Sequence, residues 1–138
     1  MAGYSSTPLA KKLGIKEGFI IKLVNKPAHY FDLFTEMPTG IAIADEIETK
    51  KNLVHFFTTD AMELRDKLPQ LKKEIRPDGI IWVSWPKKSA NVPTDVNENM
   101  IREVALGNGL VDIKVCAVDD VWSGLKLVIP VKERNAIG

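Results

Sequence analysis

Two adjacent lysines in a polar loop are the side chains of this chain best suited to binding chemistry. Lys87 and Lys88 lie in the segment Pro86–Asp95, which also contains Ser89, Thr94 and Asp95. Two ammonium groups, several hydroxyl and amide groups and the start of a following helix together suit an anion such as a phosphate or carboxylate. The alternative, which we favour, is a solvated basic loop in which Thr94 or Asp95 only caps the helix. Asp95 would also repel an anion bound at that helix end.

A second candidate site consists of Trp122 and Ser123, which the sequence places in the turn between the last two expected strands, beside Asp119 and Asp120. A tryptophan in a turn could stack on a ligand or anchor a protein partner. It could also fold back over the edge of the sheet, and we favour this interpretation. Ser123 lacks the Gly-x-Ser-x-Gly elbow of a serine nucleophile, and neither histidine is placed by sequence to activate it.

The remaining reactive side chains have simpler interpretations. His55 alternates with apolar residues in a strand, which predicts a buried, hydrogen-bonded histidine, and His29 lies near the start of a helix. Cys116 lies in another apolar strand and is expected to be a small core residue. Asp45 and Glu46 are interpreted as turn charges. They would suit a ribose-binding role only if the strand before them were parallel to its neighbours.

Composition excludes several classes of function. With 19 Lys and Arg against 18 Asp and Glu, the net charge of +1 lacks the footprint of a nucleic-acid binder or a polybasic membrane-surface protein. One cysteine and two histidines are too few for a zinc site built from Cys and His alone, and no metal is predicted. No secretory or myristoylation signal is recognisable, and no apolar run approaches the roughly 20 residues that span a bilayer. We therefore expect a cytoplasmic protein without a membrane or nucleic-acid partner, in an oligomeric state that the sequence leaves open.

The chain length predicts one α/β domain over residues 1–138, large enough to hold a core without disulfides. Six strands are expected, at Phe19–Val24, Ile41–Ala44, Leu53–Phe57, Ile80–Trp85, Leu110–Val118 and Gly124–Val131. The connection between the last two strands is too short for a parallel crossover, so they must be antiparallel neighbours.

The first two helices are expected in the N-terminal third of the chain. One covers Thr7–Leu13, with Thr7 as N-cap and Gly14 as its end. The other begins at Pro27, ends at Pro38 and Gly40, and carries Tyr30, Phe31 and Phe34.

The third helix has the clearest pattern, because its apolar residues recur at the helical period: Ala61, Leu64, Leu68, Leu71 and Ile75. Asp60 and Glu63 form a capping-box start. Pro69 predicts a kink or two short helices, and Pro77-Asp78-Gly79 predicts a turn.

The last helix has apolar residues every fourth position at Val96, Met100 and Val104. Thr94 or Asp95 is expected to cap its start, and Gly107 and Gly109 its end.

The order of elements predicts a three-layer, Rossmann-like sandwich with a mainly parallel sheet of about six strands and an antiparallel C-terminal hairpin. One connection is ambiguous. About eight residues separate Ala44 from Leu53, whereas a parallel crossover usually takes a dozen or more. The second strand therefore pairs antiparallel with the third, or the chain returns without a helix.

Two resemblances follow from these residues. Arg76-Pro77-Asp78-Gly79 before an apolar strand, and the run from Gly109-Leu110 to the last strand, resemble class I methyltransferases. Other segments resemble a small bacterial family of uncharacterised proteins, a domain of unknown function: Gly3-Tyr4-Ser5, Thr7-Pro8-Leu9, Lys12-Leu13-Gly14-Ile15, Trp85-Pro86-Lys87-Lys88, Thr94-Asp95, Gly109-Leu110-Val111-Asp112, Lys114-Val115-Cys116 and Trp122-Ser123-Gly124-Leu125.

The methyltransferase resemblance does not extend to the cofactor loop. Such enzymes place a glycine-rich turn after the first strand, whereas this chain has Asn25-Lys26-Pro27-Ala28-His29. No nucleophile–base pair or phosphate loop can be assembled, and no cofactor is predicted. The sequence favours a non-catalytic cytoplasmic binding or regulatory module with a protein partner. The alternative is a small enzyme or sensor that binds an anionic metabolite or nucleotide at Lys87, Lys88 and the helix start at Thr94.

Overall fold

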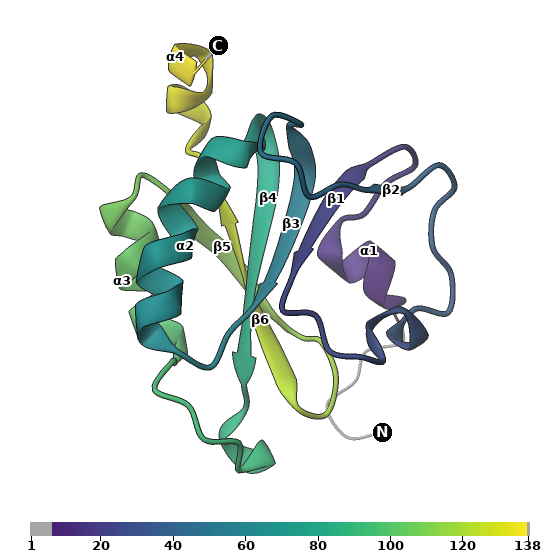
Figure 1. The fold of residues 1–138 in the computed structure, drawn as a ribbon, viewed down its shortest axis with the longest axis vertical. Helices are drawn as coiled ribbons and strands as arrows, with labels where there is room; N and C mark the ends of the chain where they lie inside the picture. Colours follow the sequence, from purple (N-terminus) through teal and green to yellow (C-terminus); the bar gives the residue numbers. More distant parts are fainter. Residues whose placement is uncertain (1–6, 138) are drawn as a thin grey trace.

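The chain forms a six-stranded mixed sheet with helices on both faces (Figure 1). The computed structural model describes residues 7–137. The strands lie in the order β2 (Ala42–Ile43), β1 (Ile20–Val24), β3 (Lys51–Phe57), β4 (Ile75–Pro86), β6 (Trp122–Val128) and β5 (Val111–Ala117). The first four are parallel to one another, and β6 is antiparallel to both β4 and β5. This arrangement confirms the predicted Rossmann-like sheet with its antiparallel hairpin.

The direction of β2 resolves the alternative left open by the sequence. It pairs with β1 in parallel, so antiparallel pairing with β3 is wrong. The chain then returns through residues 44–50 without a helix. Parallel sheets are usually covered on both faces by the helices of their crossovers. Because residues 44–50 contain no helix, no crossover helix from this connection covers the face of β1 that lies beside it.

The larger core lies between the sheet and two helices, α2 (Ala61–Glu74) and α3 (Glu98–Gly107). Asp60 caps α2 as expected, accepting a hydrogen bond from the backbone N–H of Met62. The helix is continuous through Pro69, so the prediction of two short helices is wrong. A proline inside a helix removes only one backbone hydrogen bond, and the apolar face of α2 continues to pack on the sheet beyond it.

The opposite face of the sheet carries α1 (Leu9–Leu13) and the 3-10 turn η1 (Tyr30–Leu33). The indole N–H of Trp82 donates to the carbonyl oxygen of Leu13 at 2.8 Å, which fixes α1 to the centre of the sheet. Pro8, not Thr7, precedes the first helical residue. The longer helix predicted from Pro27 is wrong. This segment forms only a 3-10 turn. Tyr30 is buried against Phe57 of β3 whereas Phe31 is 48% exposed, so the aromatic residues do not line one helical face.

Two predicted turns belong to strands. β4 begins at Ile75 and runs through Pro77-Asp78-Gly79, where an irregularity in its pairing with β3 accommodates the extra residues. β6 begins at Trp122, so Trp122 and Ser123 lie in a strand.

The remaining elements are short: η2 (Lys88–Ala90), η3 (Val131–Glu133) and α4 (Arg134–Ile137). No helix within residues 7–137 is long and apolar enough to cross a membrane.

Candidate functional site

Four connecting segments meet where the parallel strands end, at the edge where open α/β sheets bind ligands. Three of them follow β1, β3 and β4, and the fourth joins β5 to β6. Backbone hydrogen bonds tie them together: Lys87 donates its N–H to Val121 O at 2.8 Å, and Asp95 donates to Thr59 O at 3.3 Å. The long loop after β4 is thus held between the hairpin turn and the start of α2.

A cavity of about 710 Å³ opens beside this loop. Its lining includes four of the residues singled out in the sequence, Lys87, Lys88, Thr94 and Asp95. Neither lysine forms an ion pair within residues 7–137. Two ammonium groups at one cavity therefore remain available to an anion. Ser89 is exposed on η2 and does not line the cavity.

Thr94 and Asp95 hold the loop in place. The Thr94 hydroxyl donates to Thr59 O at 2.9 Å and accepts from Val96 N–H at 3.0 Å. The Asp95 carboxylate accepts from Ala61 N–H at 2.7 Å, at the start of α2. The sequence predicted that one of these two residues caps α3, and this prediction is wrong. The helix starts later, and Asn97 accepts the capping hydrogen bond from Met100 N–H.

Trp122 and Ser123 lie beside the loop but outside its cavity. Trp122 is opposite Pro86 and Ser123 is opposite Trp85 in the pairing of β4 with β6. The Trp122 ring packs edge-on against Phe57, with centroids 5.1 Å apart, and belongs to the smaller core on the α1 face. Trp122 is therefore a half-buried strand residue packed against this core, and the prediction that it lies in the hairpin turn is wrong.

Asn25 closes the gap between the ends of β1 and β3. Its backbone is left-handed, with φ of 57°, an uncommon conformation for any residue except glycine. Its side-chain amide donates to Phe57 O at 3.0 Å and to Glu63 Oε2 at 2.9 Å. Glu63 also accepts from the Thr58 hydroxyl and from Lys67. Burial alone would raise the pKa of Glu63, but these hydrogen bonds lower it.

Both histidines have hydrogen-bond partners that sequence spacing could not reveal. His29 Nε2 lies 3.1 Å from Asp119 Oδ2, across the edge of the sheet. His55 is fully buried, as predicted, between the Tyr30 hydroxyl at 3.0 Å and the Ser84 hydroxyl at 2.8 Å. Burial lowers the pKa of His55 to about 3, so this ring is neutral at physiological pH.

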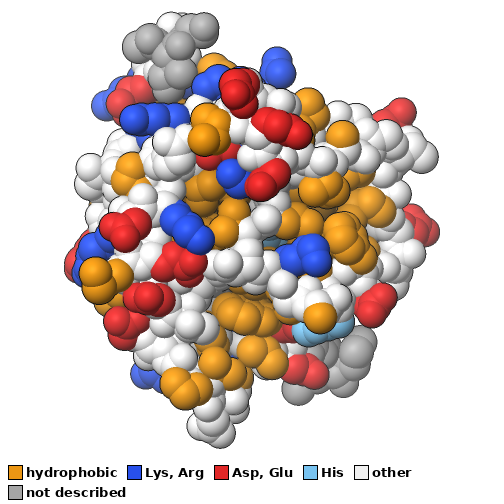
Figure 2. All heavy atoms as spheres, viewed as in Figure 1, with side chains coloured by type: hydrophobic (Ala, Val, Ile, Leu, Met, Phe, Trp, Pro, Cys, Tyr) orange, Lys and Arg blue, Asp and Glu red, His pale blue; other side chains and the backbone are white. Residues whose placement is uncertain are grey.

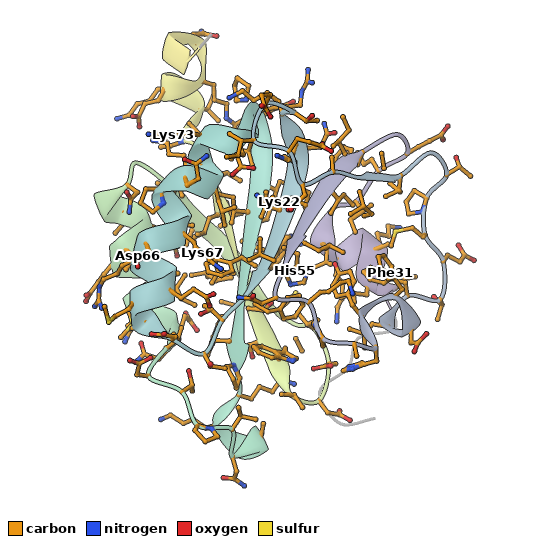
Figure 3. The ribbon with its side chains drawn as sticks, in the orientation of Figure 1. Lys22, Phe31, His55, Asp66, Lys67 and Lys73 are labelled. Carbon is orange, nitrogen blue, oxygen red and sulfur yellow. The ribbon has the colours of Figure 1, made fainter. Side chains whose placement is uncertain are left out.

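A groove of about 550 Å³ lies beside α2, on the face of β1 that no crossover helix covers. Figure 2 shows hydrophobic side chains exposed in the middle of this face, with charged ones around them. Figure 3 shows Lys22 on β1 and Lys67 on α2 at the two sides of the groove. Lys22 pairs with Glu74 at 3.0 Å and with Asp45 at 3.7 Å.

Two other assignments from the sequence can be compared with the fold. Asp45 follows a parallel strand, the condition set for a ribose-binding role, but it is largely exposed and its described partner is Lys22. Cys116 is half-buried and packs against the smaller core, where burial raises the pKa of its thiol. Within residues 7–137, no group of three His, Cys, Asp or Glu side chains is arranged to hold a metal ion.

Comparisons with known proteins agree with this architecture. A family model described as "Protein of unknown function (DUF3052)" matches residues 32–131. No curated protein sequence matches the chain.

Similar solved structures include several methyltransferases. The ribosomal protein L11 methylase of Lactobacillus delbrueckii subsp. bulgaricus is 14% identical with a TM-score of 0.57, and the match covers 88% of this chain and 74% of that one. A putative type 11 methyltransferase from Sulfolobus solfataricus is 13% identical with a TM-score of 0.59, covering 88% and 89%. Magnesium protoporphyrin IX methyltransferase from Synechocystis PCC 6803, solved with bound SAM, is 12% identical with a TM-score of 0.54, covering 88% and 74%. At these identities the similarity establishes the fold alone.

The residues after β1 do not fit an adenosyl cofactor bound in the manner of a Rossmann fold. That mode needs a glycine-rich turn whose backbone approaches the ligand, followed by a helix whose N-terminus faces it. Here the turn contains Pro27 and no glycine, a 3-10 turn replaces the helix, and the Asn25 amide spans the gap between β1 and β3.

Proposed function

The chain belongs to the DUF3052 family of proteins of unknown function, and we propose that it is a non-catalytic binding module on a methyltransferase-like scaffold. The observation that carries the proposal is the hydrogen bonding of Asn25 to Phe57 and Glu63. These contacts occupy the point between β1 and β3 where the strand order reverses, which is the usual ligand crevice of such sheets.

The chemistry around this edge supports a binding role. Glu63 is engaged by Asn25, Thr58 and Lys67, and the Asp95 carboxylate accepts from the start of α2. These acidic groups therefore hold segments together instead of facing a substrate. We place the protein in the bacterial cytoplasm, where its single cysteine stays reduced.

Titration of the full chain with S-adenosylmethionine, followed by isothermal calorimetry, tests this proposal. We expect no saturable heat, because the Asn25 bridge and the glycine-free turn leave no path for the backbone to approach the cofactor. A methyltransferase that binds S-adenosylmethionine, measured in the same buffer, serves as the positive control. Saturable binding at micromolar concentration, with methyl transfer to any acceptor, would show that the scaffold has kept its usual activity.

A second candidate function is recognition of an anionic metabolite or nucleotide at the loop after β4. The cavity of about 710 Å³ beside Lys87 and Lys88 favours it. This volume lies within the range of small-molecule pockets, roughly 300–1,000 Å³. Asp95 opposes it in part, because its carboxylate lies in the same lining.

A thermal-shift panel of nucleotides and phosphorylated metabolites tests this second candidate. A ligand that binds here is expected to raise the unfolding temperature of the wild type. The double variant Lys87→Ala/Lys88→Ala should lose that shift, because it removes both ammonium groups without touching the contacts of Thr94 and Asp95. Lys72→Ala/Lys73→Ala, which removes two lysines from the end of α2, is the matched control. A shift that survives in the first variant and disappears in the second would reject the site.

A further inference from the structure

Three lysines gather on the α1 side of the sheet, away from the edge described above. Lys114 on β5 and Lys126 on β6 are paired residues of the antiparallel hairpin, so their side chains leave the same face. Lys16, which follows α1, lines a hollow of about 250 Å³ together with Lys126. Two strands and the N-terminal segment therefore bring three positive charges to one place.

These charges have no partner of opposite sign within the described part of the chain. None of the three lysines forms an ion pair among residues 7–137. Like charges directly opposite on paired strands destabilise a sheet. Burial, together with Lys114 and Lys16, lowers the pKa of Lys126, in keeping with an uncompensated cluster. An anion among the three ammonium groups would relieve this repulsion.

We propose that Lys16, Lys114 and Lys126 form a binding site for a small phosphate-bearing ligand, with the phosphate in the hollow between Lys16 and Lys126. The side-chain oxygen of Asn52 already accepts a hydrogen bond from Ile20 N–H, which leaves its NH₂ group as a further donor in the lining. The hollow is smaller than typical pockets for drug-sized ligands, so the phosphate group is the part that it recognises.

One carboxylate shares the hollow and sets a condition on the proposal. Asp78 is part of the lining but forms no ion pair with the lysines within residues 7–137. Its charge opposes an anion, so removing it should strengthen binding. Asn52 and Asp78 lie near the first residues of β3 and β4, at the opposite end of these strands from Lys87. The new site is therefore independent of both functions proposed above.

Calorimetric titration with pyrophosphate, at constant ionic strength set with sodium chloride, tests the site on the full chain. Lys126→Gln is expected to weaken binding by about tenfold or more, since it removes one charge-assisted contact. Asp78→Asn is expected to tighten binding. The matched control Lys72→Gln/Lys73→Gln removes two lysines from the end of α2, on the opposite face of the sheet, and should bind as the wild type does.

A stability measurement provides a second readout. Without pyrophosphate, Lys126→Gln is expected to unfold at a higher urea concentration than the wild type, because the repulsion between Lys126 and Lys114 is gone. Added pyrophosphate should stabilise the wild type more than it stabilises this variant at the same concentration. Absence of binding overturns the proposal. Equal binding by all variants, or a loss confined to Lys72→Gln/Lys73→Gln, also overturns it, and equal binding by all variants identifies an adventitious ion only.

Discussion

Replacing Glu74 by alanine is expected to lower the free energy of unfolding by about 3 kcal/mol, because it leaves a buried ammonium group without a counter-charge. Lys51 Nζ lies 2.7 Å from Glu74 Oε1, and the two side chains are 0% and 1% exposed. The other hydrogen-bond partner of Lys51 is the carbonyl oxygen of Glu46, which carries no charge to replace the carboxylate. Urea unfolding of the wild type and the variant at neutral pH measures the difference.

Two further variants separate the buried pair from ordinary surface charge. Glu98→Ala removes a 41% exposed carboxylate at the start of α3 that pairs with Arg102, and it should cost no more than about 1 kcal/mol. The double variant Lys51→Met/Glu74→Met removes both buried charges and should recover most of the stability lost in Glu74→Ala. A loss in Glu74→Ala as small as that in Glu98→Ala would mean that Lys51 reaches water when its partner is removed.

The same carboxylate gives a pH dependence of known sign. Burial alone would raise the pKa of Glu74, but hydrogen bonds from Lys51, Lys22 and Gln70 outweigh it and lower the pKa. A carboxyl with a lowered pKa in the folded state contributes stability above its unfolded pKa, about 4.3, and loses it as the pH falls through the folded value. Glu74→Gln should therefore flatten the acid end of the stability profile, below about pH 4.3.

The sequence predicts most of the fold because local patterns decide it. The apolar runs around His55 and Trp82 indicate buried parallel strands, and the spacing from Ala61 to Ile75 indicates a helix packed on a sheet. The direction of β2 could not be predicted in this way. It depends on pairing with β1 instead of β3, and the short connection in residues 44–50 is compatible with either choice.

The candidate site was only partly predictable, because most of its hydrogen bonds join residues that are far apart in the sequence. The loop from Lys87 to Asp95 could be located from composition, and the cavity beside it contains both lysines. The partners of Thr94 and Asp95 lie 35 and 34 residues away, at Thr59 and Ala61, so their structural role has no local signal. The contacts of Asn25 also span 32 and 38 residues. Its position after the first strand, where related folds place glycine, is the feature that could have drawn attention to it.

His55 connects η1 to the sheet through a buried chain of polar groups. The ring lies between the Tyr30 and Ser84 hydroxyls, and all three side chains are at most 1% exposed. It also stacks on Phe57, with ring centroids 4.2 Å apart. A neutral imidazole offers one donor and one acceptor nitrogen, and each hydroxyl can take the complementary role. The 3-10 turn that carries Tyr30 is thus hydrogen-bonded to β3, and β3 to β4.

Replacing His55 by leucine is expected to lower the free energy of unfolding by about 3 kcal/mol at pH 7. The change leaves the Tyr30 and Ser84 hydroxyls buried without a partner, at about 1–3 kcal/mol each, and the added apolar contacts of leucine offset part of this. Urea unfolding measures the loss. Tyr30→Phe is the matched control, because it removes one hydrogen bond and keeps the ring. It should cost about half as much.

The pH profile separates this role of His55 from simple packing. Burial lowers the pKa of His55 to about 3, whereas the unfolded chain titrates near 6.5. Between these values the unfolded state binds the proton and the folded state does not. Wild-type stability should therefore fall by about 1.4 kcal/mol for each pH unit below 6.5 through this group alone. His55→Leu should lose that slope between pH 6.5 and 4.5, and Tyr30→Phe should keep it. An unchanged slope in His55→Leu would mean that the ring is already protonated in the folded protein and that its hydrogen bonds to Tyr30 and Ser84 are not those of a neutral imidazole.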